Sequence, residues 1–250
     1  MQSKKLWEEQ NYYKWSDESF FTDRIKKLVF ELINHLNTKI AKNVLDVGSG
    51  TGDLIYRLAK KYTNNSYFGC DISESVIKQN IISKPEITWS VKDLNNATDF
   101  KSDFFDIIIA GEIIEHLYNS DLFILEMSRI LKPSGLLFIT TPNLASWLDR
   151  VTLLFGLQPF CTEVSNISRK FGRENFYKLL RSNADSPSVG HIRCFTRSAL
   201  LSFLRYYKFT VVKEIPCYHH EFLLNKFITK ILPSLAQQLF VIARKKHDNF

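Results

Sequence analysis

Three glycines alternate with other residues directly after an apolar run, at Gly48, Gly50 and Gly52. The run is typical of a buried strand, and a helical pattern follows it, so the loop predicts a nucleotide-sized pocket at the end of a parallel strand. A dinucleotide-binding loop needs a further glycine at position 53, where the chain has Asp53. Asp46 would also repel a pyrophosphate. The spacing therefore favours a ligand with a cationic centre and a short carboxylate tail.

An acid ends the next predicted strand, at Asp71, 25 positions after Asp46. A carboxylate offers two acceptor oxygens in one plane, so Asp71 can accept both hydroxyls of a ribose. Ile72 follows directly and could pack on one face of an adenine ring. The spacing from the glycine loop predicts that both residues bind the same nucleoside.

A second group of reactive side chains follows the fourth predicted strand. Glu112, Glu115 and His116 stand at positions i, i+3 and i+4, which share one face if they lie on a helical turn. Two carboxylates and an imidazole on one face predict an Mg²⁺-type or related divalent-cation site. The alternative is a metal-free site in which His116 caps a helix or lines the cofactor pocket. His191 could act as a general base or make a structural hydrogen bond.

The pattern Asp46-x-Gly48-x-Gly50-x-Gly52, with Ser49 inside the loop, resembles motif I of class I methyltransferases that use S-adenosylmethionine. The resemblance is strong over residues 43–141 and weak elsewhere. It implies that loop N–H groups meet the methionine carboxylate and that Asp46 lies near the amino group or the loop backbone.

Two more residues gain a role from the resemblance. It implies that Asp93 accepts a hydrogen bond from the adenine amino group, with the backbone of Leu94 nearby. A solvent-exposed loop acid is the alternative for Asp93. Both residues follow a short predicted strand at residues 88–91.

The E-x-x-E-H pattern is similar to two metal-using subgroups of this family. One comprises the O-methyltransferases of the ubiquinone pathway, and the other the terminal 2′-O-methyltransferases of small RNAs. The second subgroup takes a further histidine from a later segment, which His191 could supply here. With or without a metal, Glu112 and His116 are expected close to the transferable methyl group.

Alternating patterns predict an α/β fold with a doubly wound sheet. Strands are expected at residues 43–47, 67–71, 88–91, 105–110, 135–141, 210–215 and 239–243, with helices at 53–62, from 73, at 121–131 and at 196–206. The resemblance implies a Rossmann-like, mostly parallel sheet of seven strands in the order 3-2-1-4-5-7-6, with the last strand antiparallel.

The chain is expected to divide into a helical extension and one cofactor-binding domain. Residues 1–42 carry apolar side chains at helical spacing, which predicts core packing or, alternatively, a lid over the cofactor. Residues 43–250 form the methyltransferase domain. Within it, residues 144–193 are interpreted as a substrate-facing cap, because an insertion of this size is usually functional.

Composition limits the partners and the compartment. The formal net charge of +7 indicates either a lysine-rich surface or a preference for anionic partners. Lysine and arginine are scattered along the chain, which weakens the case for nucleic acid without excluding it. The four cysteines form no C-x-x-C pair, so free thiols in a reducing cytoplasm are expected. Neither a signal peptide nor a transmembrane segment is expected.

The predicted function is transfer of a methyl group from S-adenosylmethionine to a small-molecule, sugar-linked or lipid-linked acceptor, with O-methylation favoured. Core packing is the first interpretation of the apolar stretch at residues 144–157, and a docking face for a lipid-linked acceptor, with peripheral membrane contact, is the second. Three alternatives remain: a metal-dependent RNA 2′-O-methyltransferase, a non-catalytic partner subunit that binds the cofactor, and a nicotinamide oxidoreductase. The missing third glycine argues against the last.

Overall fold

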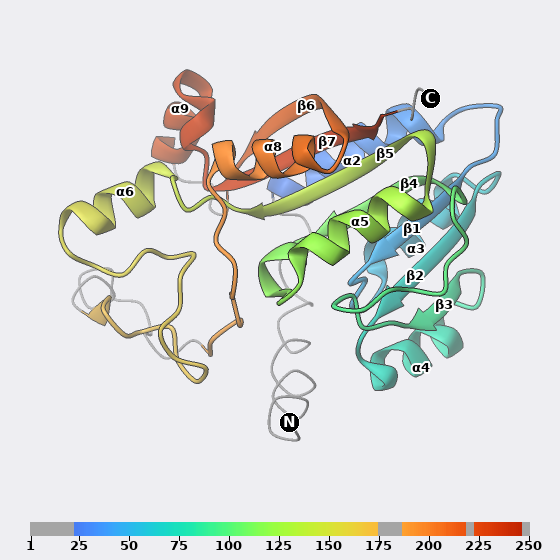
Figure 1. Ribbon diagram of the computed structural model, residues 1–250, viewed down its shortest axis with the longest axis horizontal. Coiled ribbons are helices and arrows are strands. Elements are labelled where there is room, and N and C mark those ends of the chain that lie inside the picture. Colours follow the sequence, from blue (N-terminus) through green and yellow to red (C-terminus); the bar gives the residue numbers. More distant parts are fainter. Residues whose placement is uncertain (1–22, 175–186, 219–222, 247–250) are drawn as a thin grey trace.

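The computed structural model describes residues 23–174, 187–218 and 223–246, and Figure 1 shows them as one sheet flanked by helices. Seven strands lie in the order β3-β2-β1-β4-β5-β7-β6. Their bounds are β1 Asn43–Val47, β2 Ser66–Asp71, β3 Thr88–Val91, β4 Phe105–Gly111, β5 Leu131–Pro142, β6 Phe209–Cys217 and β7 Gln238–Lys245. Strands β1 to β5 pair in parallel, and β7 is antiparallel to both of its neighbours. The predicted fold and strand order are confirmed.

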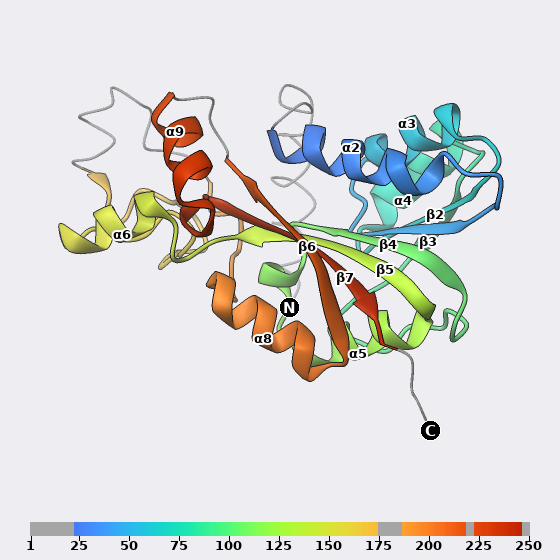
Figure 2. The same cartoon turned by 90° about the horizontal axis from the view of Figure 1, so that it is seen from above.

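Helices cover both faces of the sheet, as Figure 2 shows. Helices α2, α3 and α4 lie on one face, and α5 and α8 lie on the other. Their bounds are α2 Asp23–Leu36, α3 Asp53–Lys61, α4 Glu74–Ser83, α5 Ser120–Ile130 and α8 Arg197–Tyr206. A sheet with both faces covered needs apolar side chains on both sides, which explains the continuous apolar run in β4.

Helix α2 packs on the sheet through the apolar stripe seen in the sequence. Leu28, Leu32 and Leu36 are fully buried and join a cluster that includes Phe138 of β5 and Phe240 of β7. An ion pair between Glu31 and Lys213 of β6, at 2.6 Å, adds a polar contact at the rim. The part of the predicted helical extension before residue 23 lies outside the described residues.

Strand β5 begins earlier than the sequence predicts. Residues 132–134, which the sequence places between the helix at 121–131 and the strand at 135–141, lie within the strand, because Leu131 already pairs with Phe105. The register then shifts before Leu136 pairs with Ile107, and Ser134 adopts a φ of 64°. A left-handed residue within a strand is typical of a bulge, which accommodates the Lys-Pro-Ser-Gly sequence without ending the pairing.

The chain leaves the sheet after β5 and returns to it at α8. It first forms α6 (Trp147–Leu154) and then an irregular segment, of which residues 175–186 lie outside the described residues. An isolated bridge between Asn143 and Phe195 brings the two ends of this excursion together at the end of β5. That position agrees with a cap, which stays a prediction.

Two elements near the carboxyl terminus were not expected. Helix α9 (Leu223–Ile231) and the 3-10 turn η3 (Pro233–Leu235) connect β6 to β7. In the described part of the chain, no helix combines the length and apolar character needed to cross a membrane. All four cysteines are free, as predicted.

Candidate active site at the carboxyl edge of the sheet

The glycine loop connects β1 to α3 and has the left-handed backbone that the sequence predicts. The φ angles of Gly48, Gly50 and Gly52 are 67°, 53° and 72°. A Cβ atom on Gly52 would stand 2.2 Å from the Trp89 ring, and one on Gly48 would stand 2.8 Å from Ile113. Gly52 therefore excludes a side chain for reasons of both backbone angle and space, whereas at Gly48 the backbone angle disfavours one and the end of the Ile113 side chain would have to move.

Asp71 holds this loop from the end of β2. One carboxylate oxygen accepts the N–H of Gly50 at 2.9 Å, and the other accepts the N–H of Ser73 at 3.0 Å. Each carboxylate oxygen has a second lone pair, so these bonds leave acceptor capacity for a ligand. Ile72 beside it is 47% exposed, an apolar surface next to a buried carboxylate. The two residues stand together as the sequence predicts, and their ligand contacts stay a prediction.

Asp46 lies buried under the loop. Burial and, to a lesser extent, the charge of Asp71 raise the pKa of its carboxyl to about 7, against the opposing effect of the Arg24 guanidinium. Ser49 donates its N–H to Cys70 O at 2.9 Å, and its buried Oγ has no hydrogen-bond partner among the described residues. A cationic ligand near Asp46 would favour the ionised carboxylate.

Asp93 lies at the surface after β3, and Leu94 is buried in the core. The carboxylate of Asp93 accepts hydrogen bonds from the backbone N–H of Asn95 and from the side-chain amides of Asn95 and Asn96. It therefore closes a local turn, which corresponds to the loop-acid alternative. A contact with adenine stays a prediction.

The structure changes the arrangement expected at the end of β4. Glu112 has a φ of 55° and lies before a short 3-10 turn, η2 (Ile114–His116), so it does not share a helical face with Glu115 and His116. Its N–H donates to Thr140 O, and its Oε2 accepts from Gln238 Nε2 at 2.9 Å. The expectation of one helical face is wrong because a left-handed residue turns the chain between β4 and η2.

Arg24 is a site residue that the sequence analysis missed. It comes from α2, yet its guanidinium reaches the ends of β4 and β5, with Nη1 3.4 Å from Thr140 Oγ1 and Nε 3.9 Å from Glu112 Oε1. It lowers the pKa of Asp46, so its charge acts on the cofactor side as well. The apolar stripe of α2 gave no signal for it, because an arginine beside such a stripe is ordinary.

Glu115, His116 and His191 converge in a second cluster. Each can direct one ligand atom into a space where these atoms lie within 4.8 Å of one another. Glu115 Oε2 accepts the hydroxyl of Thr141 at 3.0 Å, whereas Oε1 has no hydrogen-bond partner among the described residues. Oε1 lies 3.9 Å from His116 Nε2. The approach of His191 to the E-x-x-E-H segment agrees with the later histidine that the resemblance implies.

Backbone carbonyls orient both imidazoles. His116 Nδ1 lies 3.2 Å from Gly190 O, and His191 Nδ1 lies 3.0 Å from Cys161 O. In neutral rings this geometry assigns the proton to Nδ1 and leaves Nε2 as the acceptor nitrogen. Burial lowers the pKa of His116 to about 4, with His191 contributing, and burial lowers the pKa of His191. Both rings are therefore neutral at physiological pH.

Burial also raises the pKa of Glu115 well above its usual range, and the charge of Glu112 adds to this effect. Two neutral imidazoles and a buried carboxylate thus meet where a positive charge would stabilise all three. Residues with these properties are candidates for binding a cation or for moving a proton.

Glu163 fixes the segment that carries His191. Its carboxylate accepts N–H groups of Val189 at 3.0 Å and Gly190 at 2.8 Å, together with the hydroxyl of Ser188. Burial would raise the pKa of Glu163, but these donors and the nearby His191 lower it overall. An ionised carboxylate inside the irregular segment therefore holds the loop that places His191 beside His116.

Comparisons with known proteins point to one family. A family model described as a methyltransferase domain matches residues 39–183. The human mitochondrial ubiquinone biosynthesis O-methyltransferase is 30% identical over 62% of this chain and 44% of its own length. A ubiquinone/menaquinone biosynthesis C-methyltransferase of Paraburkholderia phytofirmans is 28% identical over 70% of this chain and 73% of its own length.

The mammalian ubiquinone biosynthesis O-methyltransferases are longer than the region that they share with this chain. The matched region covers 32% of the mouse enzyme and 44% of the human one. Among solved structures, a putative methyltransferase in complex with the Haloferax volcanii Trm112 activator aligns with a TM-score of 0.62 at 13% identity, over 97% of each chain. At that identity the likeness concerns the fold alone.

Proposed function

Since this chain belongs to the methyltransferase domain family, we propose that it transfers the methyl group of S-adenosylmethionine to a hydroxyl group of a small molecule. The observation that carries the proposal is the bond between Gly50 N–H and the Asp71 carboxylate, at 2.9 Å. It joins the left-handed loop to the acid that can accept ribose hydroxyls. The cofactor is thereby aligned beside the cluster of Glu115, His116 and His191.

The cofactor half of the site has a complementary group for each part of S-adenosylmethionine. Asp71 accepts the ribose hydroxyls, and Ile72 packs on the adenine. Asp46 receives the ammonium group, which favours its ionised form. Arg24 and the N–H groups of the glycine loop bind the carboxylate. Arg24 supplies positive charge close to Asp46 and Glu112, where an anionic group would otherwise be repelled.

The transfer itself requires alignment and removal of a proton. The acceptor oxygen attacks the methyl carbon, the bond from that carbon to sulfur breaks, and S-adenosylhomocysteine leaves as the neutral thioether. The hydroxyl proton moves to His116 or His191, whose Nε2 atoms are the acceptor nitrogens. Glu112 stands at the end of β4 between the two halves and orients the acceptor. Holding the reactants in line supplies most of the rate enhancement.

The residues present also fit a divalent cation. The buried Glu115 Oε1, which lacks a hydrogen-bond partner among the described residues, and two neutral imidazoles are suitable ligands. Glu115, His116 and His191 would hold the ion, in place of the set with Glu112 that the sequence suggested. Two nitrogen ligands favour Zn²⁺ or Mn²⁺ over Mg²⁺, which prefers oxygen. Such an ion would lower the pKa of an acceptor hydroxyl.

The acceptor class follows from the chemistry of the site and of its relatives. The curated relatives are O- and C-methyltransferases of ubiquinone or menaquinone biosynthesis by name. A phenol or catechol resembles the acceptors that those names imply, and its hydroxyl proton is acidic enough for a histidine-assisted transfer. We therefore place phenolic hydroxyls first among the acceptors to test.

Titration calorimetry with S-adenosylmethionine, S-adenosylhomocysteine and NADH tests the cofactor. The first two are expected to bind and NADH is not, and Asp71→Ala is expected to weaken binding about a hundredfold, because it removes an acceptor of charge-assisted hydrogen bonds. Asp93→Ala is the control, since this surface acid closes its own turn. The absence of binding by the wild-type protein would refute the proposal.

Turnover is tested with a panel of catechols and a radiolabelled methyl donor. The assay is run after chelation with EDTA and again after addition of Mg²⁺, Mn²⁺ or Zn²⁺. Labelled product in the presence of EDTA would exclude a required metal. Restoration by Mn²⁺ or Zn²⁺ at lower concentrations than by Mg²⁺ would support the ligand set with two imidazoles.

A further inference from the structure

Helix α9 has its polar residues inside and its apolar residues outside. Asn225 and Thr229, four residues apart on one face, are buried. Leu224, Phe227 and Ile231 are exposed, and Phe227 is 61% exposed. A surface helix of a water-soluble fold has the opposite arrangement, with its apolar stripe towards the core. The outer face of α9 is therefore suited to an apolar environment.

Helix α6 shows the same inversion. Asp149 and Thr152 are buried, whereas Leu153, Leu154 and Phe155 are more than half exposed. The inward polar groups are satisfied locally, since Asp149 accepts the hydroxyl of Ser146 and the N–H of Phe160. The inversion thus belongs to a stable local structure in which the polar atoms have partners inside.

The two inverted helices are neighbours. Trp147 of α6 donates its indole N–H to Asn225 Oδ1 of α9 at 3.0 Å. Figures 1 and 2 both show α6 and α9 at the same end of the molecule, beyond the end of β5. We call this pair the outer helix pair. Each helix of the pair exposes several large apolar residues within one or two turns, more than the single scattered ones that ordinary surfaces carry.

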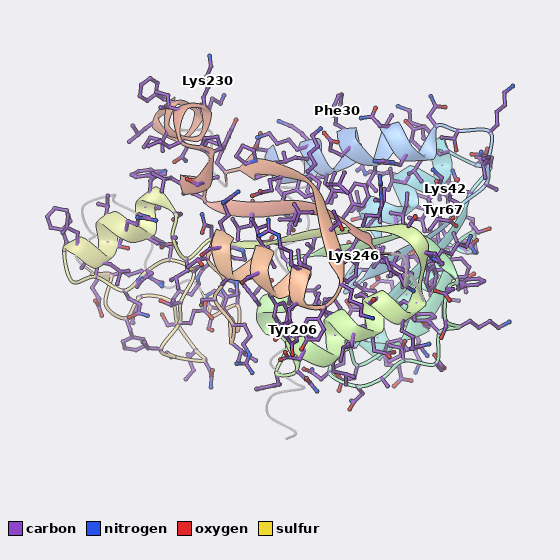
Figure 3. The ribbon with its side chains drawn as sticks, turned by 45° about the horizontal axis from the view of Figure 1, so that its top comes forward. Phe30, Lys42, Tyr67, Tyr206, Lys230 and Lys246 are labelled. Atoms are coloured by element: carbon purple, nitrogen blue, oxygen red, sulfur yellow. The ribbon has the colours of Figure 1, made fainter. Side chains whose placement is uncertain are left out.

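The charges on the outer helix pair have one sign. Lys226, Lys230 and Arg150 are exposed, and Figure 3 shows Lys230 projecting from α9 away from the protein. The sequence of α9 contains no acidic residue, and the acid of α6, Asp149, is buried. Cations interspersed with exposed Leu, Ile and Phe match the boundary between anionic headgroups and acyl chains.

We propose that the outer helix pair binds the surface of a lipid bilayer that contains anionic lipids. The nine residues of α9 span about 14 Å, less than half of a hydrocarbon core of about 30 Å. The helix therefore lies in the interface, with Leu224, Phe227 and Ile231 among the acyl chains and the two lysines at the headgroups. The proposal is independent of the proposed catalysis.

A second copy of the chain fits this surface less well. A two-fold symmetric contact brings the same patch of both copies together. The lysines of α9 would then face the same cations of the partner, without an exposed acid on either helix of the pair to neutralise them. Like charges in an interface cost several kcal/mol. Anionic headgroups offer the opposite sign, so the bilayer is the occupant that the charges favour.

Vesicle sedimentation tests the proposal with the whole chain of 250 residues. The wild-type chain is expected to bind vesicles of phosphatidylcholine with about 30 mol% phosphatidylglycerol at least tenfold more tightly than vesicles of phosphatidylcholine alone. Lys226→Glu with Lys230→Glu is expected to weaken binding to the anionic vesicles about thirtyfold or more, because each lysine contributes to the attraction. Phe227→Ser is expected to weaken binding to both kinds of vesicle.

Matched controls carry the same changes elsewhere. Lys39→Glu with Lys101→Glu alters the same charge at exposed sites, and Ile82→Ser removes an apolar residue that is 82% exposed on α4. These variants are expected to bind vesicles as the wild type does, and circular dichroism monitors the folding of all variants. Equal binding by the α9 variants, or none by the wild type, would overturn the proposal. A wild-type dimer that Phe227→Ser converts to monomer would assign the surface to a second copy instead.

Discussion

The two halves of the candidate site are built in different ways. The cofactor half, at the ends of β1 and β2, consists of a contiguous loop held by an acid 21 residues away. The acceptor half, at the ends of β4 and β5, combines η2 with His191 from a segment more than 70 residues later. One half is determined by local sequence, and the other depends on how the irregular segment folds over the sheet.

This difference shows where each half tolerates change. The glycine loop is fixed by left-handed angles and by the Trp89 ring, so substitution there affects the fold itself. The acceptor half is fixed by hydrogen bonds that Gly190 O accepts from His116, Cys161 O accepts from His191, and the Glu163 carboxylate accepts from the loop before His191. Substitution there should alter chemistry with less effect on folding. Four experiments can sharpen or break this comparison.

Gly52→Ala should have the largest effect. It combines a left-handed residue with a Cβ atom 2.2 Å from Trp89, so we expect a loss of about 3 kcal/mol in the free energy of unfolding. Gly156→Ala is the matched control, because Gly156 also has a positive φ but no atom within 4 Å of the added Cβ. It should cost about 1 kcal/mol. Urea denaturation measures both, and equal losses would show that Trp89 does not constrain the loop.

His116→Ala should lower kcat about a hundredfold or more and leave the affinity for S-adenosylmethionine within about twofold. The reason is that His116 lies in the acceptor half, where we propose that it receives a proton or holds a metal. Single-turnover kinetics and calorimetry separate the two effects. His35→Asn is the control, since this histidine packs on Phe138. Unchanged turnover by His116→Ala would show that His116 takes no part in methyl transfer.

The pH dependence of cofactor binding should follow Asp46. Its pKa of about 7 in the empty protein means that binding of an ammonium group requires loss of a proton below pH 7. We expect the affinity for S-adenosylmethionine to fall about tenfold per pH unit from pH 7 to pH 5.5. Asp46→Asn should bind more weakly and lose this slope. A slope that persists in the variant would assign the titration to another group.

The raised pKa of Asp46 also predicts how the free energy of unfolding of the empty protein changes with pH. A carboxyl whose pKa is raised in the folded state stabilises the fold while protonated, and this contribution is lost as pH rises from about 4 to about 7. Asp46→Asn should therefore reduce the loss of stability over that range.

Glu163→Gln should have the smallest of the four effects. Val189 and Gly190 donate to different oxygens of the carboxylate, and the amide keeps only one acceptor oxygen. The variant therefore loses one of these hydrogen bonds together with the negative charge, so His191 keeps its place less firmly. We expect kcat to fall about fivefold with unchanged affinity for the methyl donor. The control is Glu174→Gln, an exposed acid on the same segment. A change in cofactor affinity would show that the two halves are coupled.

The sequence predicts the cofactor half well because its determinants are local. Strand β1 and strand β3 have the predicted bounds, and Asp71 ends β2 as expected. The turn at Glu112 was missed, because a glutamate in the sequence does not indicate a left-handed backbone with a φ of 55°. Arg24 was missed because its role depends on where α2 packs, which neighbouring residues do not encode.

The later part of the chain was less predictable for a physical reason. Pattern analysis assumes that apolar residues face the core, and α6 and α9 reverse that assumption. Residues 175–186 lie outside the described residues, so the predicted cap is not tested over that part of the chain. The bounds of the cap at residues 144–193 likewise stay a prediction.

The position of Trp89 should make its fluorescence sensitive to changes in the glycine loop. The indole lies against Gly52 and Gly69 and donates its N–H to Lys84 O, so its surroundings couple the glycine loop to the end of α4. Any ligand that tightens that loop should change the emission of this ring. Intrinsic fluorescence can therefore follow occupancy of the proposed cofactor site in real time, without a label and before any acceptor is known.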